Sequence, residues 1–323
     1  MDKIKLLKFA LFEFKTKILE YCTLPPYKGS TLRGGFGHNF RKVSCTMPQD
    51  RLCTDCLLKS SCVYSYVFES LPPEDSIMMR KYPSIPHPFI IEPPADNKKH
   101  YNKGDSLDFN LILIGKAIDY LPYFVYAFEE TGRVGLGSNR QGKFIVESVA
   151  NYDEFFSNSS VIYTGTGNSL KSPSNIISPD NLNELIEKWE NTEEITFNFL
   201  TPTRIKYRDR YVDYLEFHIF MRTFLRRLSA LYYFHCGEEL ILDYKELIDR
   251  SKMIDMIKSD LHWEDWERYS SRQNEIMKFG GFKGKVTFQG NLKEFIIFIL
   301  LGTYLHVGKN ASFGLGKYGM LQV

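Results

Sequence analysis

The chain lacks long apolar runs and has no strong excess of charge of either sign. Its longest apolar stretch, FIIFILLGTYL from Phe295, is too short to span a bilayer. The first residues, MDKIKLLKFALFEFKTK, interleave charged and apolar side chains and show no pattern typical of a cleavable signal peptide. The formal net charge is +2, so overall charge does not mark the chain as a binder of polyanions. We therefore expect a cytoplasmic protein with no membrane partner.

Cysteine is also scarce, and a cytoplasmic location argues against disulfides as its main use. Of six cysteines, Cys22 and Cys236 stand alone, and we expect them to pack as small apolar groups. The other four have the spacing C-x7-C-x2-C-x5-C: Cys45, Cys53, Cys56 and Cys62. Four thiolates in one loop can close a tetrahedral zinc site that leaves no position open for a substrate. Our interpretation is a structural zinc ion, with an iron–sulfur cluster or unligated thiols as the alternatives.

The two halves of the chain show the same order of secondary structure. Each half contains a strand, a helix, two strands, a helix, a glycine-rich loop and a strand, which is the βαββαβ order of ferredoxin-like domains. We predict an α+β protein with tandem ferredoxin-like (RRM-like) domains over residues 1–150 and 194–323, connected by residues 151–193. The cysteine-rich loop, about 44–64, is an insertion in the first domain. The order of elements alone is also compatible with two unrelated α+β domains.

For the second half of the chain, the sequence predicts the bounds of each strand and helix. Alternating and β-branched residues indicate strands, and apolar residues at helical spacing indicate helices. The predicted order is strand 194–205, helix 213–235, strands 268–277 and 281–290, and helix 292–305 before the last glycine-rich loop.

The predicted helix that begins near Ser30, a residue type favoured at N-caps, contains three glycines around one histidine. Each glycine costs roughly 1 kcal/mol relative to alanine in a helix. Its apolar residues face the core, whereas His38 points the other way and shares its side with Arg41 and Lys42. Gly34 and Gly35 would leave the backbone bare beside His38, where an anionic ligand has room. The alternative is that the glycines allow close packing and the histidine is an ordinary surface residue.

The glycine-rich loop HVGKNASFGLGKYG precedes the last strand. We expect Gly308, Gly314 and Gly316 to let successive backbone N–H groups turn toward one anion. Lys309 and Lys317 would add charge for a phosphate backbone. The alternative is a tight turn between the last helix and the last strand.

An earlier copy of this loop, residues 132–142, carries Arg133 and Arg140. Residues 204–227 hold seven basic and three acidic side chains, a surplus of four positive charges (seven minus three). Such a patch attracts phosphates, although a solvated face paired with nearby acids is the alternative.

Several motifs in the same order resemble one family over nearly the whole chain. They are LRGGFGH, the cysteine cluster, PHPFIIEPP, GLGSNRQGKF, TPTR, RYSSRQ and HVGKNASFGLGKY. The family is the CRISPR-associated repeat-processing endoribonucleases, the sixth Cas family of the RAMP superfamily. The resemblance implies metal-independent cleavage of precursor CRISPR RNA within each repeat, which leaves a 2′,3′-cyclic phosphate and a 5′-hydroxyl. It implies repeat RNA as the partner, and it leaves CRISPR effector-complex subunits and a second copy of the chain open as further partners.

Catalytic sites of that family combine a histidine on the first helix with a tyrosine before it and a lysine after it. The resemblance therefore implies His38 as general base or acid, Tyr27 as proton donor or phosphate orienter, and Lys42 as charge stabiliser. Arg41 or Arg33 is an alternative to Lys42. A neutral imidazole suits removal of the 2′-hydroxyl proton, and nearby cations suit the charged transition state.

RNA contacts are expected from a larger set of basic and loop residues. The set is Arg33, Arg41, Arg133, Arg140, Arg204, Arg268, Arg272, Gly308, Lys309, Asn310, Ser312, Gly314, Gly316 and Lys317. Two other functions fit the sequence: a non-catalytic RAMP subunit that holds guide RNA in an effector complex, and a zinc-stabilised nucleic-acid-binding regulator.

Overall fold

The computed structural model divides the chain into two compact units. It describes residues 4–48, 51–80, 82–137, 139–153, 158–167, 169–270 and 275–322, with the backbone alone for 267–270 and 275–278. The N-terminal unit comprises Leu7–Ile177 and Phe234–Gly237. The C-terminal unit comprises Met1–Leu6, Ser178–Tyr233 and Glu238–Val323. The segment expected to connect the domains, 151–193, is thus divided between the two units at residues 177 and 178.

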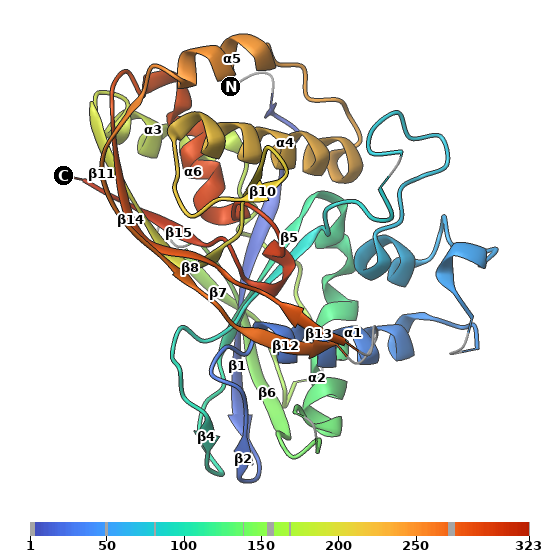
Figure 1. Ribbon diagram of the computed structural model, residues 1–323. Helices are drawn as coiled ribbons and strands as arrows, with labels where there is room; N and C mark the ends of the chain where they lie inside the picture. The colour runs from blue at the N-terminus through green and yellow to red at the C-terminus, as the bar shows by residue number, and fades with distance from the viewer. Residues whose placement is uncertain are drawn as a thin grey trace. The chain divides into compact units, whose positions relative to one another are not determined.

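Five antiparallel strands form the sheet of the N-terminal unit (Figure 1). Their spatial order is β3 (Phe89–Glu92), β5 (Phe109–Ile114), β1 (Phe9–Ile18), β6 (Phe144–Asp153) and β7 (Asn158–Thr164). Central β1 pairs Phe12 with Leu111 of β5 and with Asn151 of β6. A separate two-stranded ribbon joins β2 (Cys22–Thr23) to β4 (His100–Tyr101).

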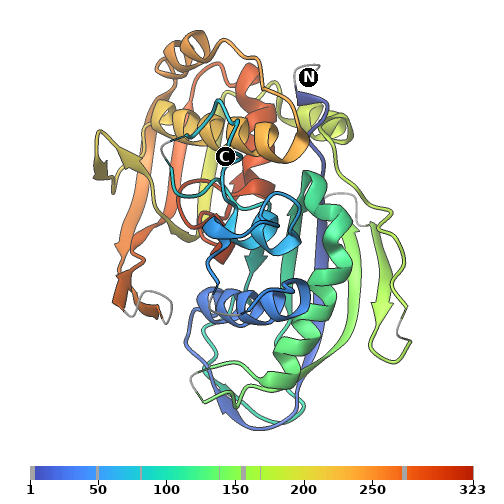
Figure 2. The same ribbon diagram turned by 90° about the vertical axis from the view of Figure 1, so that its right-hand side faces the viewer.

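Two helices, α1 (Gly29–Ser44) and α2 (Leu121–Val134), pack against each other and against this sheet (Figure 2). Aromatic rings fill the space between helices and sheet because α1 buries its apolar stripe there. The Phe36 ring stacks on Phe124 at 5.0 Å and on Phe128 at 4.9 Å between ring centroids. The N-cap lies two residues earlier than expected, at Lys28 rather than Ser30. In the order β1, α1, β3, β5, α2, β6 this unit follows the predicted βαββαβ pattern.

Four antiparallel strands form the sheet of the C-terminal unit. Their spatial order is β11 (Asp255–Glu264), β14 (Gly281–Gln289), β8 (Glu194–Thr203) and β15 (Tyr318–Leu321). The strand predicted over 268–277 is wrong, because the partner of β14 is β11, and a separate short ribbon pairs β12 (Glu267–Ser270) with β13 (Glu275–Lys278). Most side chains of β11 are exposed on both faces. The strand therefore lacks the alternation by which strands are recognised in a sequence.

Helices α4 (Phe217–Cys236) and α6 (Ile296–Leu305) lie where helices were predicted, although each begins four residues later than expected. Phe220 of α4 packs on Phe197 of β8 at 4.8 Å, and the Tyr318 hydroxyl of β15 donates a hydrogen bond to the Ile299 carbonyl of α6 at 2.6 Å. The remaining elements are α3 (Asn183–Trp189), α5 (Tyr244–Ser251), β9 (Lys206–Tyr207) and β10 (Arg210–Tyr211). None of the described helices is both long and apolar enough to cross a membrane.

Candidate functional site

Helix α1 presents an exposed imidazole and an exposed ammonium on one face. His38 lies in the third turn and Lys42 one turn later, so the two side chains are neighbours on the helix surface. The pKa of His38 is lowered, first by partial burial and then by the positive charges of Arg140 and Lys42. At neutral pH the ring is therefore mostly in its neutral form, which can accept a proton.

Arg140 reaches this face from the glycine-rich loop that follows α2. Two backbone hydrogen bonds close the loop: the Leu136 N–H donates to the Gly142 carbonyl at 2.9 Å, and the Gly142 N–H donates to the Leu136 carbonyl at 3.0 Å. Arg140 has a left-handed backbone, with φ of +54°. Its carbonyl packs where a Cβ atom on Gly135 would lie, so that glycine is needed for the close approach. The loop thus holds its arginine backbone in a fixed position.

A carboxylate on α2 adds a counter-charge to the cations. Arg133 donates from its Nη2 to Glu130 at 2.6 Å, and this pair, with a smaller contribution from the charge of Lys42, keeps the pKa of Glu130 low. Arg133 is therefore paired with Glu130 when no RNA is bound, whereas the charges of Arg140 and Lys42 both lower the pKa of His38. His38 therefore lies near the positive charges of Lys42 and Arg140, and Lys42 in turn acts on Glu130.

The glycines of α1 have different surroundings from those expected. Gly34 is exposed, and a Cβ atom there would meet nothing within 4 Å. A Cβ on Gly35 would lie 2.7 Å from Leu136 Cδ2, and one on Gly37 would collide with the Phe68 ring. The expectation that Gly35 leaves bare backbone for a ligand is therefore wrong: Gly35 and Gly37 allow close packing of side chains from other segments, and Gly34 alone is open.

Tyr27 lies apart from His38, in the turn that precedes α1. About 14 Å of helix axis separates Gly29 from His38 at 1.5 Å per residue. The Tyr27 side chain is half-buried, and its pKa is raised by burial and by the charge of Glu92 on β3. The phenol therefore remains protonated at any physiological pH.

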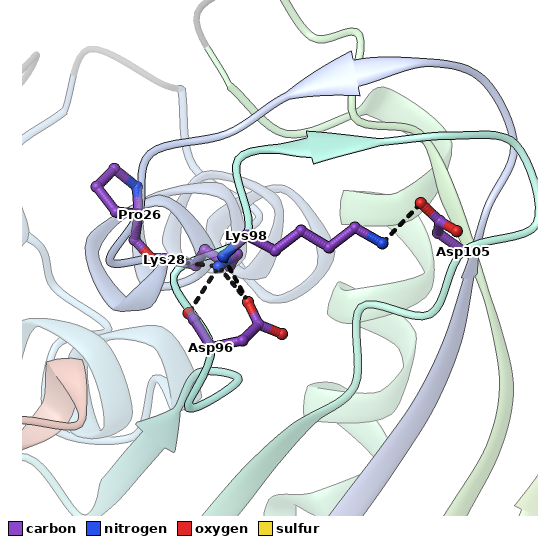
Figure 3. A network of polar contacts seen from close by, with 5 residues as sticks. All are labelled: Pro26, Lys28, Asp96, Lys98 and Asp105. Atoms are coloured by element: carbon purple, nitrogen blue, oxygen red, sulfur yellow. Dashed lines mark hydrogen bonds and ion pairs between the residues drawn. The ribbon is translucent and has the colours of Figure 1, made fainter.

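The turn that carries Tyr27 is fixed by a buried ammonium (Figure 3). The Lys28 side chain is fully buried, and its Nζ donates to the Pro26 carbonyl at 3.1 Å and to the Asp96 carbonyl at 3.1 Å. It also donates to Asp96 Oδ1 at 3.0 Å, which accepts a second bond from the Lys98 N–H at 2.9 Å. Lys98 Nζ continues the network to Asp105 Oδ2 at 2.8 Å. The start of α1 is thereby tied to the loop that follows β3.

Arg33 and Arg41 are engaged within the protein instead of facing His38. The Arg33 guanidinium lies 4.6 Å above the Phe68 ring and donates to His87 Nε2 at 2.9 Å. The Arg41 Nη2 donates to the Arg51 carbonyl at 2.6 Å, and its guanidinium lies over the Tyr64 ring. These geometries favour structural roles for both arginines over the RNA contacts and the charge-stabilising role expected for them.

The four clustered cysteines lie on the segment between α1 and β3, and all are half-buried. Burial raises the pKa of Cys53 to about 11, with further contributions from Glu69 and from neighbouring Cys62 and Cys45 that outweigh the opposing charge of Arg41. Within the described residues, no three His, Cys, Asp or Glu side chains are arranged to hold a metal ion. Zinc stays a prediction that metal analysis of the purified protein tests.

The second glycine-rich loop, residues 306–317, uses many of its own N–H groups internally. The N–H groups of Val307, Lys309 and Gly316 donate to the carbonyls of Gly316, Arg204 and Pro202 at 3.0, 2.9 and 3.2 Å. Those of Phe313, Gly314 and Lys317 also have partners within the unit: Asn310, Ala311 and Thr201. The expected row of N–H groups aimed at one anion is thus not formed by these residues.

Burial divides the loop into an inner and an outer part. Ser312, Gly314 and Gly316 are buried, so their expected RNA contacts are not supported. Lys309 is exposed, and Gly308, Asn310 and Lys317 are half-buried. Arg227 of α4 and His306 have structural contacts at the start of the loop. The Arg227 Nε donates to the Leu305 carbonyl at 2.9 Å, and the buried His306 donates from Nδ1 to the Leu315 carbonyl at 2.9 Å.

The exposed tip of this loop lies beside Arg204, whose guanidinium is 4.0 Å above the Tyr211 ring. Two other residues were expected to bind RNA. For Arg268 on β12 the structure describes only the backbone, and Arg272 lies outside the described residues.

Comparisons with known proteins match both parts of the chain. The AF_1859_N family model, described as an N-terminal domain, matches residues 7–175, which is more than half of the chain. The model of the CRISPR-associated endoribonuclease Cas6 matches residues 197–318. The chain belongs to the family of the first model, and its C-terminal part matches the Cas6 model. An uncharacterized protein of Archaeoglobus fulgidus is 24% identical over 303 residues, which is 91% of this chain and 92% of the relative.

Solved Cas6 structures share the fold along the whole chain. Thermus thermophilus Cas6 superposes with a TM-score of 0.54 at 14% identity, covering 98% of this chain and 99% of that one. A Cas6 product complex gives 0.52 at 15% identity, covering 98% and 100%. The partial Cas6-RT-Cas1–Cas2 complex gives 0.62 at 14% identity over 99% of this chain, which spans about half of that longer chain, 47%.

The sequence predicted that His38 and Lys42 share one face of a helix, which α1 shows, but it did not predict their relation to Arg140. Arg140 was expected to contact RNA from its own loop, with no relation to His38. Only the packing of α2 on α1 brings the loop after α2 to the histidine. Tyr211 was also missed, although its position among basic residues in IKYRDRY was a usable signal.

Proposed function

We propose that this protein is a metal-independent endoribonuclease that cleaves precursor CRISPR RNA within its repeats. The two units with βαββαβ order would be ferredoxin-like domains that bind the repeat. The observation that carries the proposal is the exposed, mostly neutral His38 with Lys42 one turn away and Arg140 close enough to lower its pKa. An imidazole and two cations are the groups that cleavage by an internal hydroxyl requires.

In the proposed reaction the 2′-oxygen attacks the adjacent phosphorus, and the bond from phosphorus to the 5′-oxygen breaks. His38 takes the proton of the 2′-hydroxyl while water protonates the departing 5′-oxygen, or protonated His38 supplies that proton while water takes the one from the 2′-hydroxyl. The products are a 2′,3′-cyclic phosphate and a 5′-hydroxyl. Lys42 and Arg140 stabilise the negative charge that builds on the phosphate oxygens. Tyr27, which lies at the other end of α1 from these groups and stays protonated, orients RNA by donating a hydrogen bond.

A labelled repeat RNA incubated with enzyme in excess and with EDTA tests this proposal. We expect cleavage by the wild type, and a single-turnover rate at least about 100-fold lower for His38→Ala, the range of general acid–base catalysis. RNA affinity should stay within about twofold, because the substitution removes no cation. His262→Ala is the matched control, since that imidazole is exposed on β11 of the other unit.

The 3′ end of the upstream product adds a second readout. It should resist periodate until the cyclic phosphate is opened and removed. An uncut repeat at enzyme excess, or full activity of His38→Ala, would contradict the proposal. Tight binding without any cutting would instead support a non-catalytic RAMP subunit. Precursor RNA is the proposed partner, and CRISPR complex subunits or a second copy of the chain remain proposals as further partners.

A further inference from the structure

The short ribbon of β9 and β10 concentrates positive charge and tyrosine. In register, Lys206 pairs with Tyr211 and Tyr207 pairs with Arg210. Cations and aromatic rings that alternate on an exposed ribbon are a composition typical of surfaces that bind single-stranded nucleic acid.

The Tyr211 ring carries two cations. The Arg204 guanidinium lies 4.0 Å from the ring centroid, and Lys309 Nζ lies 5.6 Å from it. Lys309 Nζ also donates to the Tyr211 hydroxyl at 3.5 Å. The Tyr211 side chain nevertheless remains 40% exposed, so part of the ring is open to solvent.

The backbone of the glycine-rich loop holds these cations together. Gly308 has a φ of +86°, and a Cβ atom there would lie 2.6 Å from the Arg204 carbonyl. The same carbonyl accepts a hydrogen bond from the Lys309 N–H at 2.9 Å. Glycine at position 308 therefore allows the loop to approach Arg204 closely, which places the lysine side chain next to the tyrosine.

The Arg204 guanidinium and the Lys309 ammonium bring two positive charges to one ring. Within the described residues Lys309 has no carboxylate at ion-pairing distance, and its ammonium and the Arg204 guanidinium both lie within 6 Å of one ring. Two like charges held near each other favour an anion between or beside them. The exposed ring offers a flat apolar surface at the same place, which a free phosphate or an acidic peptide would not use.

We propose that Tyr211, Arg204 and Lys309 form a subsite for one nucleotide of single-stranded RNA. The base stacks on the exposed part of the Tyr211 ring, and the two cations bind the adjoining phosphates. The proposal rests on the proposed RNA-processing function, but it concerns binding alone. All three residues belong to the C-terminal unit, whereas His38 belongs to the N-terminal unit.

Fluorescence anisotropy with labelled A12 RNA and with an abasic 12-mer of the same charge tests the stacking. We expect Tyr211→Leu to weaken A12 binding about fivefold or more, the range of a lost base–aromatic stack, and to change abasic binding by less than twofold. Tyr211→Trp should retain A12 binding. Lys309→Met should weaken the binding of both RNAs and reduce its salt dependence by about one ion.

Tyr214→Leu is the matched control, because Tyr214 is a similarly exposed tyrosine, at 46%, in the same unit. The subsite would be overturned if Tyr211→Leu lost affinity equally for A12 and abasic RNA, or lost affinity for neither. It would also be overturned if the wild type did not bind A12. Cleavage of repeat RNA by the wild type is measured in the same preparations. A subsite failure with intact wild-type cleavage is therefore distinct from failure of the proposed function, in which the wild type does not cut.

Discussion

The positive charge of Arg140 acts on the imidazole of His38, although the arginine comes from the loop after α2 and the histidine from α1. The arginine backbone is fixed by the packing of Gly135 against its carbonyl. The loop thus contributes to the reactivity of a residue on another element.

Removal of the Arg140 charge should raise the pKa of His38. The charge disfavours the protonated ring, so Arg140→Gln relieves part of the lowering while burial and Lys42 remain. The His38 limb of the pH–rate profile should then move to higher pH, and NMR titration of the His38 ring should show the same direction. Arg133→Gln is the control, because Glu130 already pairs with that guanidinium. An unchanged His38 titration in Arg140→Gln would contradict the interaction.

The contrast between Gly37 and Gly34 gives a test of the packing of α1. Gly37→Ala should destabilise the protein by about 1–3 kcal/mol, as overpacked sites do, because the Phe68 ring is held by Phe36, Phe89 and Arg33 and cannot simply move away. Gly34→Ala should be neutral or stabilising by up to about 1 kcal/mol, since its Cβ enters open space and alanine favours helix.

Urea unfolding of the two variants provides the measurement. Phe68→Leu combined with Gly37→Ala should cost less than the sum of the two single changes, because the smaller side chain makes room for the new methyl group. Equal stability of the two glycine variants would show that Phe68 does not occupy the space beside Gly37.

The elements that bury an apolar stripe were predictable from the sequence, and the partners of polar side chains were not. Helices α4 and α6 appear where the spacing of Phe and Leu residues placed them. The exposed strand β11 has no such pattern and was missed. The direction of the Arg41 guanidinium depends on Arg51 and Tyr64, which only the folded segment between α1 and β3 brings near. The site was thus predicted as far as its helix, and not in its contacts with the loop after α2.

Replacing Lys28 and replacing Asp96 should lower the stability of the protein by different amounts. Lys28 is fully buried, whereas the Asp96 side chain is 55% exposed. Lys28→Met replaces the buried charge with an apolar chain of similar volume and leaves the carboxylate in water, so we expect a loss of about 1 kcal/mol. Asp96→Ala strands a buried ammonium and should cost more, about 2–3 kcal/mol after allowance for the exposure of the partner.

The pH dependence of stability gives a second measurement on this pair. Burial raises the pKa of Asp96, but hydrogen bonds from Lys28 and from the Lys98 N–H outweigh that effect, so the pKa is lowered overall. A carboxyl with a lowered folded-state pKa stabilises above its unfolded pKa of about 3.9, and this contribution is lost as the pH falls through the folded value. The wild type should therefore lose more stability than Lys28→Met between pH 5 and pH 3. Equal losses in both proteins would count against the pair.

Gly316 should be the least replaceable glycine of the second glycine-rich loop. It has a φ of +77°, where an L-residue costs roughly 1–2 kcal/mol, and a Cβ there would collide with the Val307 carbonyl that lies across the loop. Gly316→Ala should therefore lower the free energy of unfolding by about 2 kcal/mol or more and weaken RNA binding, since the loop also positions Lys309 beside Arg204. Gly319→Ala on β15 is the matched control: its Cβ meets nothing within 4 Å, and stability should be unchanged or slightly higher. If Gly316→Ala unfolds at the wild-type urea concentration, the close approach of the loop to Val307 is not required for the fold.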